Sequence, residues 1–270
     1  MRFAVGVTLY NPHKEQIDNI ALLAENFDKV FLFDNSEPDY IKPNYPSSDK
    51  FEILSYNENV GLSKAFNCIM DHCNDFDFLC TMDQDSKFYA DDIHQIQSYI
   101  KNTDTTSMGI IAPYIDYGSG KHQQKKTIES KSWVITSGSF VNLNVVRKFN
   151  LKYDEKYFID KFEIDMCEQI KQVGGCIIMY HKSVLHQELG EKSGHKHPNH
   201  SPLRHYYLFR NRFYFNNKWH SGICGILLSI LQTVRHLCLI AMYEKNKIKK
   251  TKVLLDAYFD YKHNKLGKKS

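Results

Sequence analysis

The stretch FLCTMDQDS, residues 78–86, decides the fold. A mostly apolar run of five residues ends abruptly in two carboxylates, Asp83 and Asp85, with Gln84 between them. Buried strands of parallel sheets have such continuous apolar runs. Ligands of α/β proteins bind beyond the carboxyl ends of these strands. The stretch therefore predicts an α/β protein with a ligand site where this strand ends.

The chain on both sides of this stretch alternates in the same way. Strand-like runs are expected at residues 3–9, 30–33, 51–55 and 109–112, and helical spacing of apolar residues lies between them. Later in the chain, strands are expected at 133–137, 140–143 and 176–180, a helix at 161–173, and a loop at 187–205. This order predicts an α/β fold with a mainly parallel central sheet, flanked by helices and followed by a C-terminal helical extension.

Composition excludes several classes of protein. With 270 residues, 42% hydrophobic and 24% charged, the chain is neither disordered nor collagen-like. A net charge of +4 does not favour a nucleic-acid partner, so none is expected. Seven cysteines without a C-x-x-C pair argue against a disulfide framework and favour a reducing cytoplasm. The first residues lead directly into a strand, so no secretory signal is expected.

The acidic pair suits a divalent cation. Asp83 and Asp85 are two residues apart and point to the same side of an extended chain. Mg²⁺ or Mn²⁺ typically binds one or two carboxylates together with substrate phosphates. His186 follows an apolar run and is a candidate third partner, although such a histidine is often structural. The alternative for the acidic pair is a solvated turn after a strand.

Two other segments are candidates for nucleotide binding. Asp34 ends an apolar run and could accept a hydrogen bond from the imide N–H of uracil or thymine, or it could open an Asx-turn. Gly61 stands before an expected helix, where the backbone can approach an anion closely. The alternative there is an ordinary strand–helix connection with Ser63 as the cap.

A cluster of acids around residue 163 offers candidates for a general base. Asp160, Glu163 and Asp165 lie at or near the start of the expected helix. One of them could take a proton from an acceptor hydroxyl. Asp160 and Glu163 also fit the spacing of a helix capping pattern. Glu163 and Asp165 do not share a helix face, so at most one should point at a reacting centre.

The C-terminal part differs from the rest in composition. Residues 222–243 are nearly all apolar, with one narrow polar stripe and a single charge, Arg235, which argues against a spanning helix. Lysines at 245, 247, 249, 250 and 252 follow. An apolar helix beside a lysine cluster suits an anionic membrane surface. The alternatives are a helix packed on the catalytic domain and a homodimer contact. The basic and aromatic run at 204–212 suits a diphosphate, a lipid headgroup or nucleic acid.

Taken in order, several segments resemble a family-2 glycosyltransferase of the GT-A fold. They are VTLYN at 7–11, FDNS at 33–36, NVGLS at 59–63, MDQDS at 82–86, TSGS at 136–139, the run from Phe158 to Cys167, and His186 with Gly190. The resemblance covers about residues 3–215. The MDQDS segment and the run that begins at Phe158 most resemble the bacterial rhamnosyltransferase-like branch.

The resemblance implies roles for these residues. Asp34 would contact the nucleotide base, Asn59, Gly61 and Gln84 would belong to the nucleotide-sugar site, and Asp83 would lie near the ribose and diphosphate. Asp85 and His186, with Asp83, would hold Mg²⁺ or Mn²⁺. Ser137, Gly138 and Ser139 would line the acceptor side. The base of the family pattern falls on Glu163. Phe162 replaces the first acid of that pattern, and Glu stands where Asp is usual, so Asp160 and Asp165 remain candidates.

The resemblance also implies an activity. It would be an inverting, metal-dependent transfer of a sugar, with rhamnose from dTDP-rhamnose as the first choice, to a hydroxyl of a lipid-linked or oligosaccharide acceptor. This step would belong to bacterial cell-surface polysaccharide or capsule synthesis. The expected division is a catalytic domain over 1–215 and a membrane-attachment region over 216–270, at the inner face of the cell membrane. The alternatives are a UDP-hexose or UDP-galactofuranose transferase, a nucleotidyltransferase, and an inactive glycan- or membrane-binding module.

Overall fold

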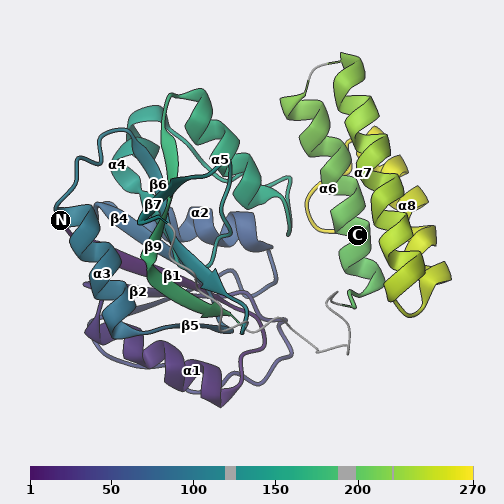
Figure 1. Ribbon diagram of the computed structural model, residues 1–270. Helices are drawn as coiled ribbons and strands as arrows, with labels where there is room; N and C mark the ends of the chain where they lie inside the picture. The colour runs from purple at the N-terminus through teal and green to yellow at the C-terminus, as the bar shows by residue number, and fades with distance from the viewer. Residues whose placement is uncertain (119–125, 188–198, 221, 270) are drawn as a thin grey trace. The chain divides into compact units, whose positions relative to one another are not determined.

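The chain forms two compact units. The computed structural model describes residues 1–118, 126–187, 199–220 and 222–269 (Figure 1). The first unit, here called the sheet unit, consists of Met1–Asp154 with Glu163–Glu188. The second, the helical unit, consists of Glu155–Phe162 with Leu189–Ser270. The boundary expected at residue 215 falls inside helix α6, Pro202–Trp219, because it was placed where the family resemblance ends.

The sheet unit is built on one mixed sheet. Its nine described strands are β1 (Phe3–Leu9), β2 (Lys29–Asp34), β3 (Phe51–Ser55), β4 (Phe78–Asp83), β5 (Ser86–Phe88), β6 (Met108–Asp116), β7 (Ile128–Ser130), β8 (Ser139–Asn142) and β9 (Cys176–Gln187). Their order is β3-β2-β1-β4-β8-β6-β9-β5, with β7 paired to β9. Strands β1 to β4 pair in parallel, as do β6 and β9. Strand β8 runs antiparallel to both β4 and β6.

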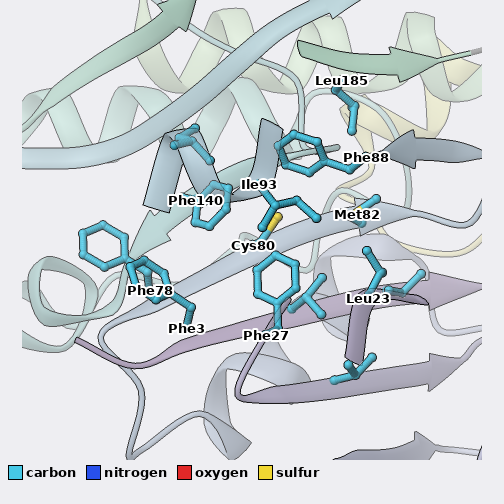
Figure 2. Close-up of a cluster of buried hydrophobic side chains, with 14 of the residues drawn as sticks. Phe3, Leu23, Phe27, Phe78, Cys80, Met82, Phe88, Ile93, Phe140 and Leu185 are labelled. Atoms are coloured by element: carbon cyan, nitrogen blue, oxygen red, sulfur yellow. The ribbon is translucent and has the colours of Figure 1, made fainter. Parts of the chain in front are cut away.

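Helices cover both faces of this sheet. They are α1 (Lys14–Ala21), the short 3₁₀ helix η1 (Leu22–Glu25), α2 (Leu62–His72), α3 (Ala90–Lys101), α4 (Leu143–Phe149) and α5 (Phe162–Gln172). Apolar side chains of α1 and α3 pack with alternate residues of β1, β2 and β4 in one buried cluster (Figure 2). Helix α2 packs on the other face. The expected α/β fold with helices on both faces is confirmed.

A small residue in β1 allows α2 to pack closely. A Cβ at Gly6 would lie 2.8 Å from Cγ2 of Ile69 in α2. Both Ile69 and the neighbouring Leu79 are fully buried. Because α2 rests directly on β1, its N-terminal end is fixed close to the carboxyl ends of the parallel strands.

Some expected elements differ in the structure. The segment 133–137 is not a strand; its backbone carbonyls accept hydrogen bonds from side chains instead, as when Thr81 Oγ1 donates to Thr136 O at 2.7 Å. Helix α2 is capped by Gly61 at a φ of 83°, while Ser63 lies within the first turn. The expected loop at 187–205 overlaps two elements, because β9 includes Gln187 and α6 begins at Pro202. Residues 188–198, which include Gly190, lie outside the described residues.

The helical unit contains α6, α7 (Gly222–Tyr243) and α8 (Lys247–Lys262). Helix α6 packs against both of the others around a small aromatic and aliphatic cluster. Arg210 is almost fully buried in this unit and donates to Gly267 O at 2.7 Å. The basic and aromatic run at 204–212 is therefore largely interior, and Arg210 is unsuited to a headgroup. Lys250 is also buried, so it does not belong to an exposed lysine cluster.

Helix α7 is oriented opposite to the usual amphipathic pattern. Its small and polar residues Gly225, Ser229 and Thr233 are buried, whereas large apolar residues are exposed. The exposed ones include Ile223, Ile226, Leu227, Ile230, Leu231 and Val234, all more than half exposed. By length and mean hydropathy, 1.8, α7 is a candidate membrane span, the one such helix among the residues described.

Candidate functional site

The expected donor residues gather where the parallel strands end. Gln84 follows β4, and its side-chain amide pairs with the backbone of Tyr10, which follows β1. Tyr10 N donates to Gln84 Oε1 at 2.7 Å, and Gln84 Nε2 donates to Tyr10 O at 3.0 Å. This two-bond contact fixes the acidic loop against the end of β1. The ring of Tyr10 is about half exposed beside it.

Asp34 is buried at the end of β2, and its charge is compensated. Its Oδ2 lies 2.6 Å from Nζ of Lys42, and its Oδ1 accepts from Ser36 N at 3.0 Å. Burial alone would raise the pKa of Asp34. The hydrogen bonds from Lys42 and Ser36 outweigh burial and hold this pKa below its usual value. Asp34 is therefore ionised at neutral pH and held in one orientation.

Asn35 joins the end of β2 to the start of α2. Its Oδ1 accepts from Val60 N at 2.8 Å, and Asn59 Oδ1 accepts from Gly61 N at 3.1 Å. Ser36 Oγ accepts from Asn11 N at 2.9 Å. Three loops that follow β1, β2 and β3 are thus connected, and the structure brings Asp34, Asn59 and Gly61 into one region.

The Ser137-Gly138-Ser139 turn lies directly behind the acidic pair. Asp83 N donates to Ser137 Oγ at 3.2 Å, and Ser137 Oγ donates to Ser86 Oγ at 2.6 Å. Gly138, at a φ of 77°, donates its N–H to Thr81 O at 2.7 Å. Ser137 and Ser86 are both buried. Their hydroxyls therefore hold the loop that carries Asp83. An acceptor contact from this turn stays a prediction.

Asp85 and His186 are brought near each other by strand pairing. Strand β5 begins directly after Asp85 and pairs antiparallel with β9, with Lys87 opposite His186. Strand β6 lies on the other side of β9 and places Asp116 opposite the same histidine. Asp116 Oδ2 lies 3.7 Å from His186 Nδ1. Asp85 is exposed, and the side chain of His186 is 43% exposed.

A second carboxylate contacts the strand that carries His186. Asp92, in the first turn of α3, accepts from Val184 N at 2.8 Å through its Oδ1. Burial raises the pKa of Asp92, while the Val184 N–H and the nearby His186 lower it in part. Asp116 is close enough to the imidazole to influence its orientation.

These donors fit a hard cation chemically. Carboxylate oxygens and a neutral imidazole are ligands that Mg²⁺ and Mn²⁺ accept, with phosphate oxygens completing the shell. Within the described ranges, no three His, Cys, Asp or Glu side chains lie close enough to form a metal centre alone. Asp83, Asp85 and His186 would thus supply part of a coordination shell that a diphosphate completes.

The three candidate bases have different surroundings. Asp165 is fully buried in α5 and accepts from Gln169 Nε2 at 2.8 Å. Glu163 is half-buried in the first turn of the same helix, on another face. Together with burial, its charge raises the pKa of the Cys167 thiol to about 12. Asp160 belongs to the helical unit, has a φ of 62°, and accepts from Arg204 Nη2 at 3.0 Å.

Sequence reasoning missed three of these residues. Lys42 lies in a proline-containing loop and carries no signal that it would reach back to Asp34. Asp116 and Asp92 are separated from His186 by 70 and 94 positions, and only the pairing of β9 with its neighbours brings them together. For Asp116 and Asp92, the one available signal in the sequence was a histidine at the end of a strand, which often has an acidic partner.

Comparison with known proteins identifies the family. The model of glycosyl transferase family 2 matches residues 12–186, which include Asp34, Asp83, Asp85 and His186. The chain belongs to this family. The glycosyltransferase is also 25% identical to the dTDP-rhamnosyl transferase RfbF of Shigella flexneri, over 96% of this chain and 94% of that protein. The family resemblance and the expected enzyme class are confirmed.

Solved structures support the GT-A fold of this glycosyltransferase. Residues 1–349 of TarS from S. aureus, in complex with UDP-GlcNAc, match with a TM-score of 0.59 at 13% identity, covering 97% of this chain and 80% of that one. GalNAc-T7 with UDP, GalNAc and Mn²⁺ matches with a TM-score of 0.54 at 12% identity, covering 87% of this chain and 54% of that one. At these identities the likeness concerns the fold alone.

Proposed function

We propose that this glycosyltransferase moves rhamnose from dTDP-rhamnose to a hydroxyl of a lipid-linked or oligosaccharide acceptor, with inversion, in bacterial cell-surface polysaccharide or capsule synthesis. The observation that carries the donor proposal is the likeness to a dTDP-rhamnosyl transferase along 96% of the chain. The strand-end residues Asp34, Asp83 and Asp85 supply groups that suit a base, a ribose and a diphosphate. A UDP-sugar is the second candidate, because two GT-A neighbours hold UDP compounds.

The donor site would work as follows. Asp34 accepts the imide N–H of the base, and its orientation is already fixed by Lys42 and Ser36. Asp83, held by Ser137, faces the ribose and diphosphate. Asp85 and His186 would hold Mg²⁺ or Mn²⁺, and the bound cation would supply positive charge to balance the charge of the nucleoside diphosphate. Asp116 would orient His186 for this role.

Glu163 is the proposed general base. It would take the proton of the acceptor hydroxyl while that oxygen attacks the anomeric carbon and the bond to the donor diphosphate breaks. One in-line displacement inverts the configuration, and no covalent enzyme intermediate is needed. Two observations favour Glu163 over the other acids: Asp165 is fully buried, and Asp160 is bonded to Arg204.

The helical unit would attach the protein to the inner face of the cell membrane. The exposed apolar side chains of α7 continue on α8, where Ile248, Leu255 and Phe259 are more than half exposed. Lys245 and Lys249 are exposed near the junction of these helices. Apolar side chains flanked by lysines suit the surface of an anionic bilayer. Co-sedimentation with phosphatidylglycerol vesicles tests this attachment. A concentration-dependent dimer without vesicle binding would favour the homodimer contact instead.

Donor binding tests the central proposal. Thermal shift and donor hydrolysis are measured with dTDP-rhamnose, UDP-GlcNAc, UDP-glucose and UDP-galactofuranose, each with Mg²⁺, Mn²⁺ or EDTA. We expect metal-dependent stabilisation and hydrolysis with dTDP-rhamnose. Asp85→Ala should lose both. Asp18→Ala, which removes an exposed carboxylate from α1, is the matched control and should behave like the wild type.

The outcomes separate the candidates. Preference for a UDP-sugar moves the assignment to the second candidate. Binding without turnover by any donor and acceptor combination supports an inactive module. Release of inorganic diphosphate from a nucleoside triphosphate and a sugar phosphate identifies a nucleotidyltransferase. Equal stabilisation in EDTA excludes the proposed metal dependence.

A further inference from the structure

The helical unit contains a cavity whose walls are mainly basic. It lies along α6 and α7 and has a volume of about 400 Å³. Its polar lining includes Lys161, His200, Arg212, Arg235, His236 and Glu244. None of these residues belongs to the donor site described above. Three of them carry fixed positive charges, so the balance of charge depends on Glu244.

Glu244 is already neutralised by other groups. Its Oε2 lies 2.6 Å from Nζ of the buried Lys250 and 2.9 Å from Nε2 of His205. Burial would raise the pKa of Glu244, but these two partners hold it below its usual value. The carboxylate and the Lys250 ammonium form a closed pair. The charges of Arg212 and Arg235 therefore dominate the cavity.

Arg212 is bonded to neutral groups only. Its Nη2 lies 2.9 Å from His236 Nδ1, and its Nη1 donates to Thr233 Oγ1 at 3.3 Å. Neither Arg212 nor Arg235 has a carboxylate within salt-bridge distance in the described parts of the chain. Burial lowers the pKa of Arg212 to about 10. A partly buried cation without an anionic partner is costly, and binding of an anion compensates this cost.

Hydrogen bonds to neighbouring side chains orient Arg212 in the cavity wall. Since Glu244 accepts from His205 Nε2, the other nitrogen of a neutral His205 is an acceptor, and His236 Nε2 donates to it at 3.0 Å. His236 Nδ1 is then an acceptor for Arg212. Burial first of all lowers the pKa of both histidines, which agrees with neutral rings. The Arg212 guanidinium is thus held by an acceptor on one side while it lines the cavity.

The cavity lies next to the exposed apolar face of α7. Leu208 and Leu239 line it together with the basic groups. Arg235 belongs to the lining and follows Val234, which is 53% exposed on the outer face of the same helix. Anionic and apolar parts of one ligand would therefore find matching surfaces within one helix turn.

We propose that this cavity binds the diphosphate group of a lipid-linked acceptor, with the lipid chain along the exposed face of α7; this inference rests on the proposed function. Lys161, which lines the cavity, stands two positions before the proposed base Glu163 in the sequence. Arg212 and Arg235 supply most of the affinity. Free inorganic diphosphate shares the anionic chemistry, and the apolar chain distinguishes the two.

The test is binding of farnesyl diphosphate to the full chain, measured by calorimetry in EDTA, which removes the cation on which donor binding depends in the proposed function. Inorganic diphosphate and farnesol are the two comparison probes. We expect farnesyl diphosphate to bind at least tenfold more tightly than either. Arg235→Gln should weaken this binding about tenfold, equivalent to ~1.4 kcal/mol, and Arg212→Met more. Lys268→Gln, which removes an exposed charge from the same unit outside the cavity, should change it less than twofold.

Several results would overturn the inference. Equal affinity of wild type and Arg235→Gln would do so, even if Arg212→Met fails to fold. Equal affinity for farnesol and farnesyl diphosphate would mean that the site is only an apolar surface. Equal affinity for inorganic diphosphate and farnesyl diphosphate would mean that the lipid chain contributes nothing to binding. Failure of donor binding with retained farnesyl diphosphate binding would contradict the proposed function alone. Retained donor binding without farnesyl diphosphate binding would contradict this inference alone.

Discussion

The side-chain amide of Gln84 forms two hydrogen bonds with the backbone of Tyr10, at 2.7 and 3.0 Å. These two hydrogen bonds join the chain segments that directly follow β1 and β4. Asp83 and Asp85 flank Gln84 on either side. The positions of both acids thus depend on an uncharged side chain, which leads to the first prediction.

Replacement of Gln84 by alanine should weaken donor binding more than it destabilises the protein. Loss of two partly exposed hydrogen bonds costs about 1–2 kcal/mol of unfolding free energy. We expect the donor Kd to rise about tenfold because the acidic loop loses its fixed position. Thermal shift with dTDP-rhamnose and urea unfolding measure the two effects. Gln95→Ala, an exposed position on α3, is the control. An unchanged donor Kd would contradict the role of this contact.

Replacement of Lys42 by methionine should destabilise the sheet unit by about 1–3 kcal/mol at neutral pH, because it leaves the buried Asp34 charge without its cation. The Asp34 pKa is lowered in the folded state, so the stability it contributes is present above its unfolded pKa. That stability is lost as the pH falls through the folded pKa. The difference between wild type and variant should therefore shrink in acid. Urea unfolding at pH 7 and pH 3 measures it.

A surface pair provides the contrast for this experiment. Lys152 and Asp71 form an ion pair in which both side chains are more than half exposed. Lys152→Met should change stability by less than about 1 kcal/mol. If Lys42→Met and Lys152→Met lowered the free energy of unfolding equally, the burial of Asp34 would not make its ion pair with Lys42 more important for stability.

Substitution of the three candidate bases should separate catalysis from structure. Glu163→Gln should lower kcat about 100-fold or more while the donor Kd stays unchanged. Asp165→Asn should cost about 1–3 kcal/mol of stability through its contact with Gln169 and leave most of kcat. Asp160→Asn tests the third acid, which is bonded to Arg204. Acceptor-dependent release of dTDP measures kcat. A larger loss for Asp160→Asn would move the base to that residue.

Acid should destabilise the helical unit through His236. Burial and the nearby Arg212 lower its folded pKa from 6.5 to about 3. Below pH 6.5 the unfolded chain binds a proton that the folded one does not, so stability falls by about 1.4 kcal/mol per pH unit for this site. His236→Gln should flatten the profile between pH 6.5 and pH 4. His94→Gln, an exposed position on α3, serves as the control and should leave the slope unchanged.

The sequence predicts the sheet unit well because its main signals are local. Apolar runs that end in polar residues mark β1, β2 and β4, and residue pairs such as Asp83 and Asp85 stand next to each other in the chain. The α/β fold with a mainly parallel sheet follows from this order, whereas the GT-A fold was implied by the family resemblance and the donor site stays a prediction. The segment 133–137 was wrongly expected to be a strand, since its apolar composition does not reveal that side chains satisfy its backbone.

What the sequence could not provide depends on contacts between distant residues. The Asp34–Lys42 ion pair requires a loop to fold back, and the Asp116–His186 contact requires the pairing of β6 with β9. In the helical unit, the lysine run gave no sign that Lys250 would turn inward to Glu244 while its neighbours stay exposed. Periodicity located the polar stripe of α7 but did not determine whether that stripe faces the interior or the solvent.

The outward apolar face of α7 has a kinetic consequence. A protein held on a bilayer by this face meets a lipid-linked acceptor by lateral diffusion within a plane. Its rate would then follow the surface density of the acceptor rather than the amount per volume of solution. Adding acceptor-free vesicles at constant total acceptor would slow the reaction by dilution in two dimensions, whereas a water-soluble acceptor analogue would escape that effect.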